Sequence, residues 1–262
     1  MTIAAIADYQ AALRETIAFR KTVVGSTGIA GVWLSSWFYT GDPTTGGAVG
    51  NTANGVVPTD ATTGAPAINF GAGVGYLARG VCNATLAPGR FLLYDRLFHS
   101  GAHACSTLYT LAAQPSYASR IDTYVGTQIW VELVNAWTVS PLFTITYTNQ
   151  SGVAGQTTTY QLGGTRNTNQ AYQIPLAAGD SGVQKIESVN TGSGGAGQTF
   201  NVIVARPLFL AALDPVGIKD RPASLDLTLL PRVYGDSCLA FFYQYTSGSV
   251  PLIEAALEVA SL

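Results

Sequence analysis

The sequence predicts an all-β protein, namely a jelly-roll-like antiparallel β-sandwich with an N-terminal helical arm. Short segments rich in branched and aromatic residues recur through residues 29–213, and Gly, Asn, Asp and Pro turns separate most of them. No strand–helix–strand rhythm appears, which argues against a parallel sheet. We therefore expect a helical arm at 1–28, the sandwich at 29–213, and a linker with a C-terminal strand pair at 214–262 that completes the β domain.

The helical arm is predicted from residues 3–22. Ile3, Ile6, Leu13 and Ile17 recur at helical spacing and would form one apolar face. An amphipathic helix needs a surface to lie on, so these four residues are candidate contacts. The surface is either the chain's own β domain or a neighbouring subunit.

Ten segments have the composition and length of strands. Within 142–148, aromatic and branched residues alternate with threonines, which predicts one buried and one exposed face. Asn149 and the glycines after it predict a turn in which Asn149 caps its own backbone. The predicted strands are 29–39, 91–98, 127–135, 142–148, 156–162, 171–176, 183–190, 200–206, 239–246 and 253–259.

A long loop is predicted at 40–64, where most residues are Gly, Thr, Asn, Asp or Pro. A loop of this length is usually functional or disordered. Its carboxylates, Asp42 and Asp60, are suitable calcium ligands, but their spacing matches no calcium-binding loop. We instead expect Asp42, Asn51, Asn54 and Asp60 to contact neighbouring subunits.

Charged residues make up only 11% of the 262 residues, against about 25% in a typical soluble domain. So few charges predict that much of the surface is contact area, and we expect a homo-oligomer, most simply a trimer. The 13 basic residues form no run that would favour direct nucleic-acid binding. No apolar stretch is long enough for a membrane helix, and no signal-peptide pattern opens the sequence, so synthesis in a cytoplasm is expected.

Residues that could carry chemistry form no recognised motif. His99, His103, Cys105 and Cys82 could supply four zinc ligands, but their spacing is not that of a structural zinc site. The sequence has neither a Gly-x-Ser-x-Gly nucleophile motif nor a Walker lysine. We expect no enzyme, no cofactor and no metal, and we expect the three cysteines to be reduced, buried apolar residues.

Four tryptophans raise the alternative of a carbohydrate-binding module, because aromatic faces stack on sugars. Trp33 and Trp37 lie four residues apart and would point to the same side of one strand, while Trp130 and Trp137 flank the segment 131–135. Aromatic residues in β-sandwiches also form cores and subunit contacts. We favour that second interpretation.

The run FTITYTNQSGVAGQTT at 143–158 resembles a hairpin found in virion structural proteins of tailed bacteriophages. The flanking segments 92–99 and 174–183 stand in the same order as in that family, and the resemblance covers roughly 90–210. It implies a non-enzymatic virion component, with a capsid decoration (cement) protein favoured and the major capsid protein lattice as partner. A tail-associated or receptor-binding module and the capsid subunit itself remain alternatives.

Overall fold

A computed structural model of the chain describes residues 13–22, 30–49, 51–70, 74–85, 89–192, 197–213, 219–222, 230–245 and 252–261. In these ranges the protein consists of β-strands and two three-residue 3-10 helices, η1 (Ser36–Phe38) and η2 (Ala118–Arg120). The described strands pair antiparallel throughout. The predicted all-β, antiparallel fold class is thereby confirmed. None of the helices in these ranges has the length and apolar character needed to cross a bilayer.

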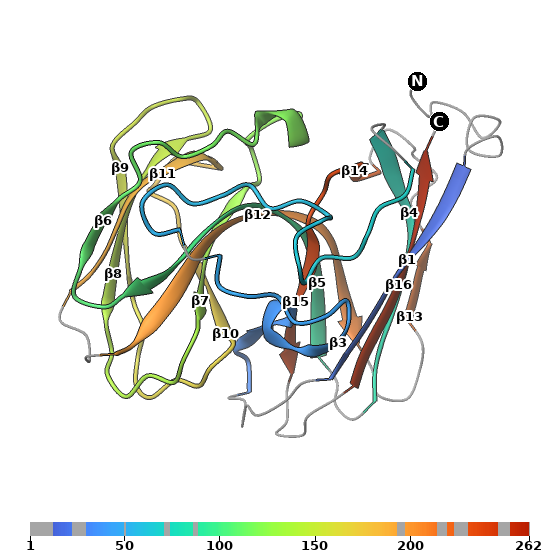
Figure 1. Cartoon of the computed structure of the whole chain (residues 1–262), viewed down its shortest axis with the longest axis horizontal. Coiled ribbons are helices and arrows are strands. Elements are labelled where there is room, and N and C mark those ends of the chain that lie inside the picture. Colours follow the sequence, from blue (N-terminus) through green and yellow to red (C-terminus); the bar gives the residue numbers. More distant parts are fainter. Residues whose placement is uncertain are drawn as a thin grey trace.

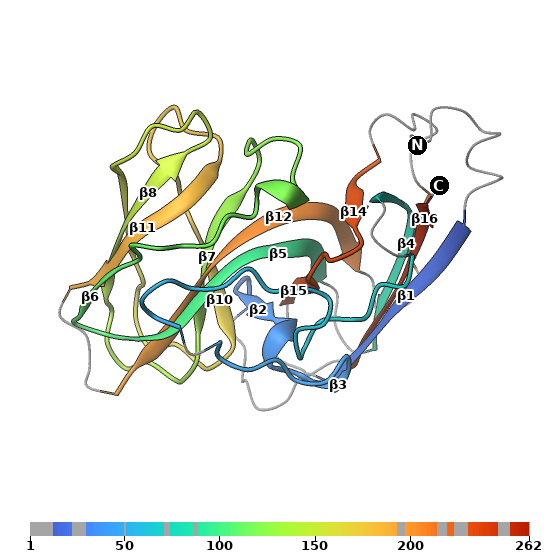
Figure 2. The same cartoon turned by 45° about the horizontal axis from the view of Figure 1, so that its top comes forward.

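The strands form a closed barrel flanked by two sheets (Figures 1 and 2). The barrel contains, in order, β10 (Gln170–Ile174), β2 (Trp33–Ser35), β15 (Leu239–Tyr245), β5 (Gly89–Ala104), β12 (Thr199–Leu213) and β7 (Gln128–Leu133). A four-stranded sheet contains β6 (Leu108–Thr110), β11 (Val183–Thr191), β8 (Leu142–Asn149) and β9 (Gln156–Gln161). A six-stranded sheet contains β13 (Lys219–Pro222), β4 (Val74–Ala84), β16 (Leu252–Ser261), β1 (Leu13–Thr22) and β3 (Thr40–Asp42), with β14 (Arg232–Tyr234) pairing to β4.

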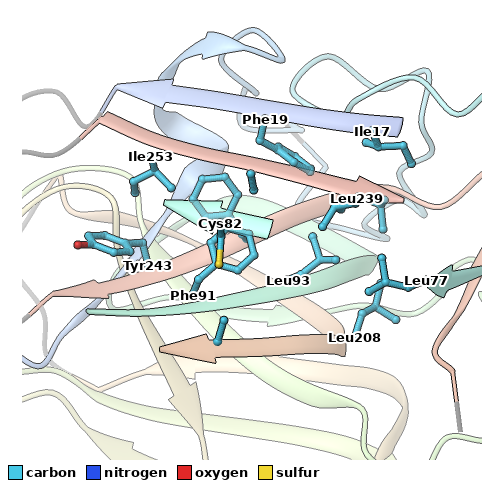
Figure 3. Packing of buried hydrophobic residues seen from close by; sticks show 14 of the residues in the cluster. Ile17, Phe19, Leu77, Cys82, Phe91, Leu93, Leu208, Leu239, Tyr243 and Ile253 are labelled. Carbon is cyan, nitrogen blue, oxygen red and sulfur yellow. The ribbon is translucent and has the colours of Figure 1, made fainter. Parts of the chain in front are cut away.

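The two longest strands, β5 and β12, connect the halves of the molecule. They pair with each other along nearly their whole length, from Thr199 opposite Ala104 to Leu213 opposite Gly89. One end of this ribbon packs on the six-stranded sheet in a first core, where side chains of β1, β4 and β16 face those of β5, β12 and β15 (Figure 3). The other end packs on the four-stranded sheet in a second core.

The barrel has an apolar interior of its own. The Trp130 ring stacks on Phe242 at 4.1 Å between centroids, and Phe242 stacks on Tyr94 at 4.3 Å. Since β7 and β15 are not neighbours in the barrel, the contact between Trp130 and Phe242 crosses its interior. The barrel is therefore a packed element rather than an open channel.

The prediction of a helix is wrong for residues 13–22, which form β1. Ile17 and Phe19 are buried while Thr16 and Ala18 are exposed, so the side chains alternate with a period of two rather than with a helical period. Pairing with β16 over ten residues fixes the strand, with β3 on its other side. The rest of the predicted helix, including Ile3 and Ile6, lies outside the described residues.

Nine of the ten predicted strands are confirmed, with ends shifted by up to seven residues. The tenth, 29–39, is a strand only at β2, after which the chain turns into η1. Strands β3, β4, β6, β13 and β14 were not predicted; in β4 the Gly and Ala content hides the pattern. The two C-terminal strands do not pair with each other: β15 lies in the barrel, and β16 lies between β1 and β4.

The hairpin at 143–158 has the predicted turn. Asn149 Oδ1 accepts the backbone N–H groups of Ser151 and Val153, each at 3.0 Å. Gly152 and Gly155 have φ of 80° and 74°, in the left-handed region that glycine favours. The predicted alternation along β8 is also confirmed, since Phe143, Ile145 and Tyr147 are fully buried.

Candidate functional site

The barrel encloses a buried ion pair between Arg96 of β5 and Glu132 of β7. Arg96 Nη1 and Nη2 donate to the two carboxylate oxygens at 2.9 and 2.5 Å, and neither side chain is exposed. Ser35 Oγ donates to the same carboxylate at 2.6 Å, and the guanidinium lies 4.3 Å from the Trp37 ring centroid. Burial alone would lower the pKa of Arg96, but the charge and hydrogen bond of Glu132, together with Tyr94 and Cys238, more than offset this and raise it. Because Arg96 and Glu132 lie on different strands and are joined by two hydrogen bonds, the geometry of the pair is fixed.

A second ionic cluster lies around the buried carboxylate of Asp95. Its oxygens accept from Arg120, from Arg206 at 3.2 Å, and from Ser237 Oγ at 2.9 Å. The backbone N–H of Cys238 donates to it at 3.0 Å. Asp95 thus ties β5 to η2, to β12 and to the turn before β15, which is a structural role.

Ser100 and His103 come closest to a catalytic pair. Ser100 Oγ lies 2.8 Å from His103 Nε2, the arrangement that a nucleophile and its general base would need. Both side chains have no exposed surface, and the His103 ring is enclosed by Tyr109 and Phe200. A substrate carbonyl cannot reach Ser100 Oγ in this arrangement, so the pair is part of the packing around Tyr109 and Phe200.

The four residues weighed as zinc ligands do not converge. His99 Nδ1 accepts from Arg96 Nε at 3.3 Å, while Cys82 lies in the first core. Across the described ranges, no three His, Cys, Asp or Glu side chains are grouped as metal ligands. All three cysteines are free: Cys82 and Cys238 are buried, and Cys105 is half-buried against the second core.

The buried histidines predict a loss of stability in acid. Burial lowers the pKa of His103 to about 4, and burial with the nearby Arg96 charge holds the pKa of His99 well below its usual value. Below about pH 6.5, His99 and His103 therefore bind protons in the unfolded chain but stay neutral in the folded chain until the pH is much lower. The free energy of unfolding should fall between about pH 6.5 and 4, by about 3 kcal/mol for His103 alone. Urea unfolding should be measured at several pH values across this range. The free energy of unfolding should fall less steeply with decreasing pH for His103→Gln than for the wild type. Equal slopes would contradict this assignment.

The outer face of the four-stranded sheet is mainly polar, and its two central rows contain no charged residue. Its inner face carries the second core, so the residues between the buried positions point to solvent. The strand register aligns them in rows, and Thr146 Oγ1 lies 3.4 Å from Thr157 Oγ1 across two strands. Two central rows contain Leu108, Asn190, Thr144 and Thr159, and Thr110, Ser188, Thr146 and Thr157.

A shallow hollow of about 450 Å³ lies on the outward side of the six-stranded sheet. Ala18 and Ala256 form part of its floor, and the exposed pair of Arg20 and Glu254, 3.4 Å apart, lies at its rim. Asp42, a predicted contact residue, is exposed on β3 and lines the same hollow.

The other predicted contact residues of the loop bind within their own chain. Asn51 Oδ1 accepts from the Asn54 N–H at 2.9 Å, and Asn54 Oδ1 accepts from the Ala113 N–H at 3.3 Å. Asp60 Oδ2 accepts from the Ile68 N–H at 3.4 Å. The structure brings Asn51 and Asn54 together and uses these residues to shape the loop.

Of the four predicted contact residues of the N-terminal arm, two lie among the described residues. Ile17 is 2% exposed and belongs to the first core, so its side chain is already covered by this chain. Leu13 begins β1. Ile3 and Ile6 precede the described residues.

The tryptophans do not form a sugar-binding platform. Trp37, Trp130 and Trp137 are at most 1% exposed, and Trp37 lies in η1 rather than on the strand that carries Trp33. Trp33 is half-buried with its ring edge-on to Trp130. These residues are core residues, as the favoured interpretation predicted.

Sequence reasoning missed the ionic clusters entirely. The one available signal is the pair Asp95 and Arg96, two charges in the middle of the apolar run 91–98. Charges at such positions are rarely fully buried unless paired. Their partners lie too far along the chain for spacing to reveal them.

Comparison with known proteins gives no family assignment. No protein-family model matches the chain, and no curated protein matches it significantly. Among solved structures, the chain is similar to a structure of the infectious bursal disease virus Gx strain, with 11% identity, 95% of this chain and 80% of that chain covered, and a TM-score of 0.22. It is also similar to the VP2 subviral particle of that virus, with 11% identity, the same coverages and a TM-score of 0.21. Likenesses this weak establish neither a common fold nor a common function.

Proposed function

We propose that this chain is a non-enzymatic structural component of a tailed-phage virion, made in the host cytoplasm and acting as a capsid decoration (cement) protein. The observation that carries the proposal is that the ionic clusters are buried, whereas the two central rows on the outer face of the four-stranded sheet contain no charged residue. Ser100 and His103, the pair that comes closest to a catalytic arrangement, are enclosed. The outward rows of the four-stranded sheet are suited to contact with other subunits.

The hairpin that carries the phage resemblance supports the same proposal. Strands β8 and β9 form it with a well-defined turn at Asn149, and their outward threonines belong to the uncharged central rows of the four-stranded sheet. Tailed-phage shell subunits usually contain a long spine helix, whereas the longest helices in the described residues have three residues. This contrast favours a protein on the shell over the shell subunit itself. In this proposal the partners are the major capsid protein lattice and other copies of the chain, most simply as a homotrimer.

Co-sedimentation with shells assembled from the major capsid protein tests this proposal. We expect saturable pelleting at a fixed ratio of this chain to shell subunits, and no saturable binding on a glycan array. Glycan binding without pelleting would overturn the proposal in favour of a receptor-binding module. Shells formed by this chain alone would overturn it in favour of a capsid subunit.

A further inference from the structure

Strand β9 is the free edge of the four-stranded sheet, at the end of the molecule away from the six-stranded sheet (Figure 1). We propose that β9 (Gln156–Gln161) pairs antiparallel with β9 of a second copy of the chain, which would join two four-stranded sheets into one of eight strands. This inference deepens the proposed function, on which it rests, by naming a two-fold contact between copies, which is separate from the three-fold contact within a trimer.

The backbone of β9 presents unused hydrogen-bonding groups at this edge. Leu162 N–H donates to the Pro141 carbonyl directly opposite at 3.1 Å, in the same register as Leu142 opposite Gln161. In an antiparallel ladder, residues whose N–H and C=O groups face the partner strand alternate with residues whose groups face away. Since Leu162 faces β8, the groups of Thr157, Thr159 and Gln161 face outward.

The opposite side of β8 agrees with this alternation. Gly192 N–H on the β11 side donates to the Leu142 carbonyl at 3.0 Å, so even-numbered residues of β8 face β11 and odd-numbered residues face β9. Within the described chain, the outward backbone groups of Thr157 and Thr159 have no second strand to pair with.

The composition of β9 leaves the edge unprotected. Natural sheets shield their edges with charges, prolines, bulges or very short strands. The sequence QTTTYQ has no charge and no proline, and its pairing with β8 contains no bulge. The other edge strands are short: β6 has three residues, β3 has three and carries Asp42, and β13 reads Lys-Asp-Arg-Pro. The least protected of these edges is therefore also the longest.

The strand is complementary to itself in one register. A two-fold axis at Thr159 places Thr159 opposite Thr159 of the second copy and Thr157 opposite its Gln161. These are the residues whose backbone groups face outward, so each opposed pair can exchange two hydrogen bonds. In the same register, the outward side chains of both copies lie on one face of the joined sheet. The threonine rows of the two copies are therefore on the same side. Thr158 then lies opposite Tyr160 of the second copy, a branched–aromatic pair that favours strand association.

We assign a second copy of the chain as the partner of β9, because β9 is complementary to itself in this register and no other sequence is needed. A protein present in many copies on a lattice also meets its own edge at high local concentration. Two-fold contacts of this kind use the same patch on both subunits.

A charge-swap experiment tests the pairing. Thr159 is exposed, so Thr159→Lys and Thr159→Glu should fold normally by circular dichroism and thermal unfolding. Each variant alone places like charges opposite each other across the axis and should weaken association in sedimentation velocity on the order of tenfold or more. An equimolar mixture of the two should restore association as a heterodimer. The matched control is Thr144→Lys. Thr144 lies on the same face of the sheet, opposite Thr159 of the same chain, but on β8, one strand in from the edge. This variant should associate like the wild type.

Several results would overturn the proposal. A wild-type chain that stays monomeric at the highest attainable concentration, or a Thr159→Lys variant that associates like the wild type, would exclude pairing at β9. Equal loss in Thr144→Lys would mean that sheet faces, not edges, make contact. If the β9 variants show no effect on association, co-sedimentation with shells is still expected. The proposals of β9 pairing and of a role on the capsid can therefore fail separately.

Discussion

Replacing Glu132 with leucine should lower the free energy of unfolding by about 3–5 kcal/mol, because the Arg96 guanidinium would remain buried without its counter-charge. Both side chains have no exposed surface, and the carboxylate also accepts from Ser35. The loss would be measured by urea unfolding at neutral pH. The double variant Arg96→Met with Glu132→Leu should recover much of it, since an apolar pair leaves no unpaired charge.

The matched control for this prediction is the exposed pair of Arg20 and Glu254. Its side chains are 71% and 48% exposed, so Glu254→Leu should change the stability by no more than about 1 kcal/mol. Equal effects of Glu132→Leu and Glu254→Leu would show that the barrel pair is not buried in solution.

Phe19→Asp should cost more than about 5 kcal/mol, enough to approach the whole stability of a typical domain. The Phe19 ring is 2% exposed and meets Phe241 edge-on at 5.6 Å in the first core. The substitution removes an aromatic side chain and places a carboxylate in the apolar first core. Circular dichroism and thermal unfolding should show a largely unfolded or strongly destabilised chain.

Ala18→Asp is the control, because Ala18 neighbours Phe19 but points outward from β1. It should fold with a melting temperature close to that of the wild type. If both substitutions were tolerated, or both were equally harmful, residues 13–22 would not form a strand with one buried face.

The sequence predicted the strands whose character is local. Phe143, Ile145 and Tyr147 alternate with threonines, and the glycines after Asn149 mark the turn, so the β8–β9 hairpin could be derived without knowledge of distant residues. The same holds for most of the barrel strands, where branched and aromatic residues are dense.

The prediction failed where distant pairing decides the structure. Residues 13–22 have apolar residues at both helical and alternating positions, and only their pairing with β16, at the other end of the sequence, selects the strand. The buried ionic clusters were missed for the same reason. Asp95 and Arg96 are visible as charges in an apolar run, but Arg120, Glu132 and Arg206 become their partners only in the folded barrel.

The copy number of this chain in purified particles tests the central claim most directly. Quantitative mass spectrometry of the virions proposed to contain this chain would compare its abundance with that of the major capsid protein. We expect a fixed, high ratio, as for a protein that occupies repeated positions on the shell. Absence from the particles, or only a few copies in each, would contradict a structural role on the capsid.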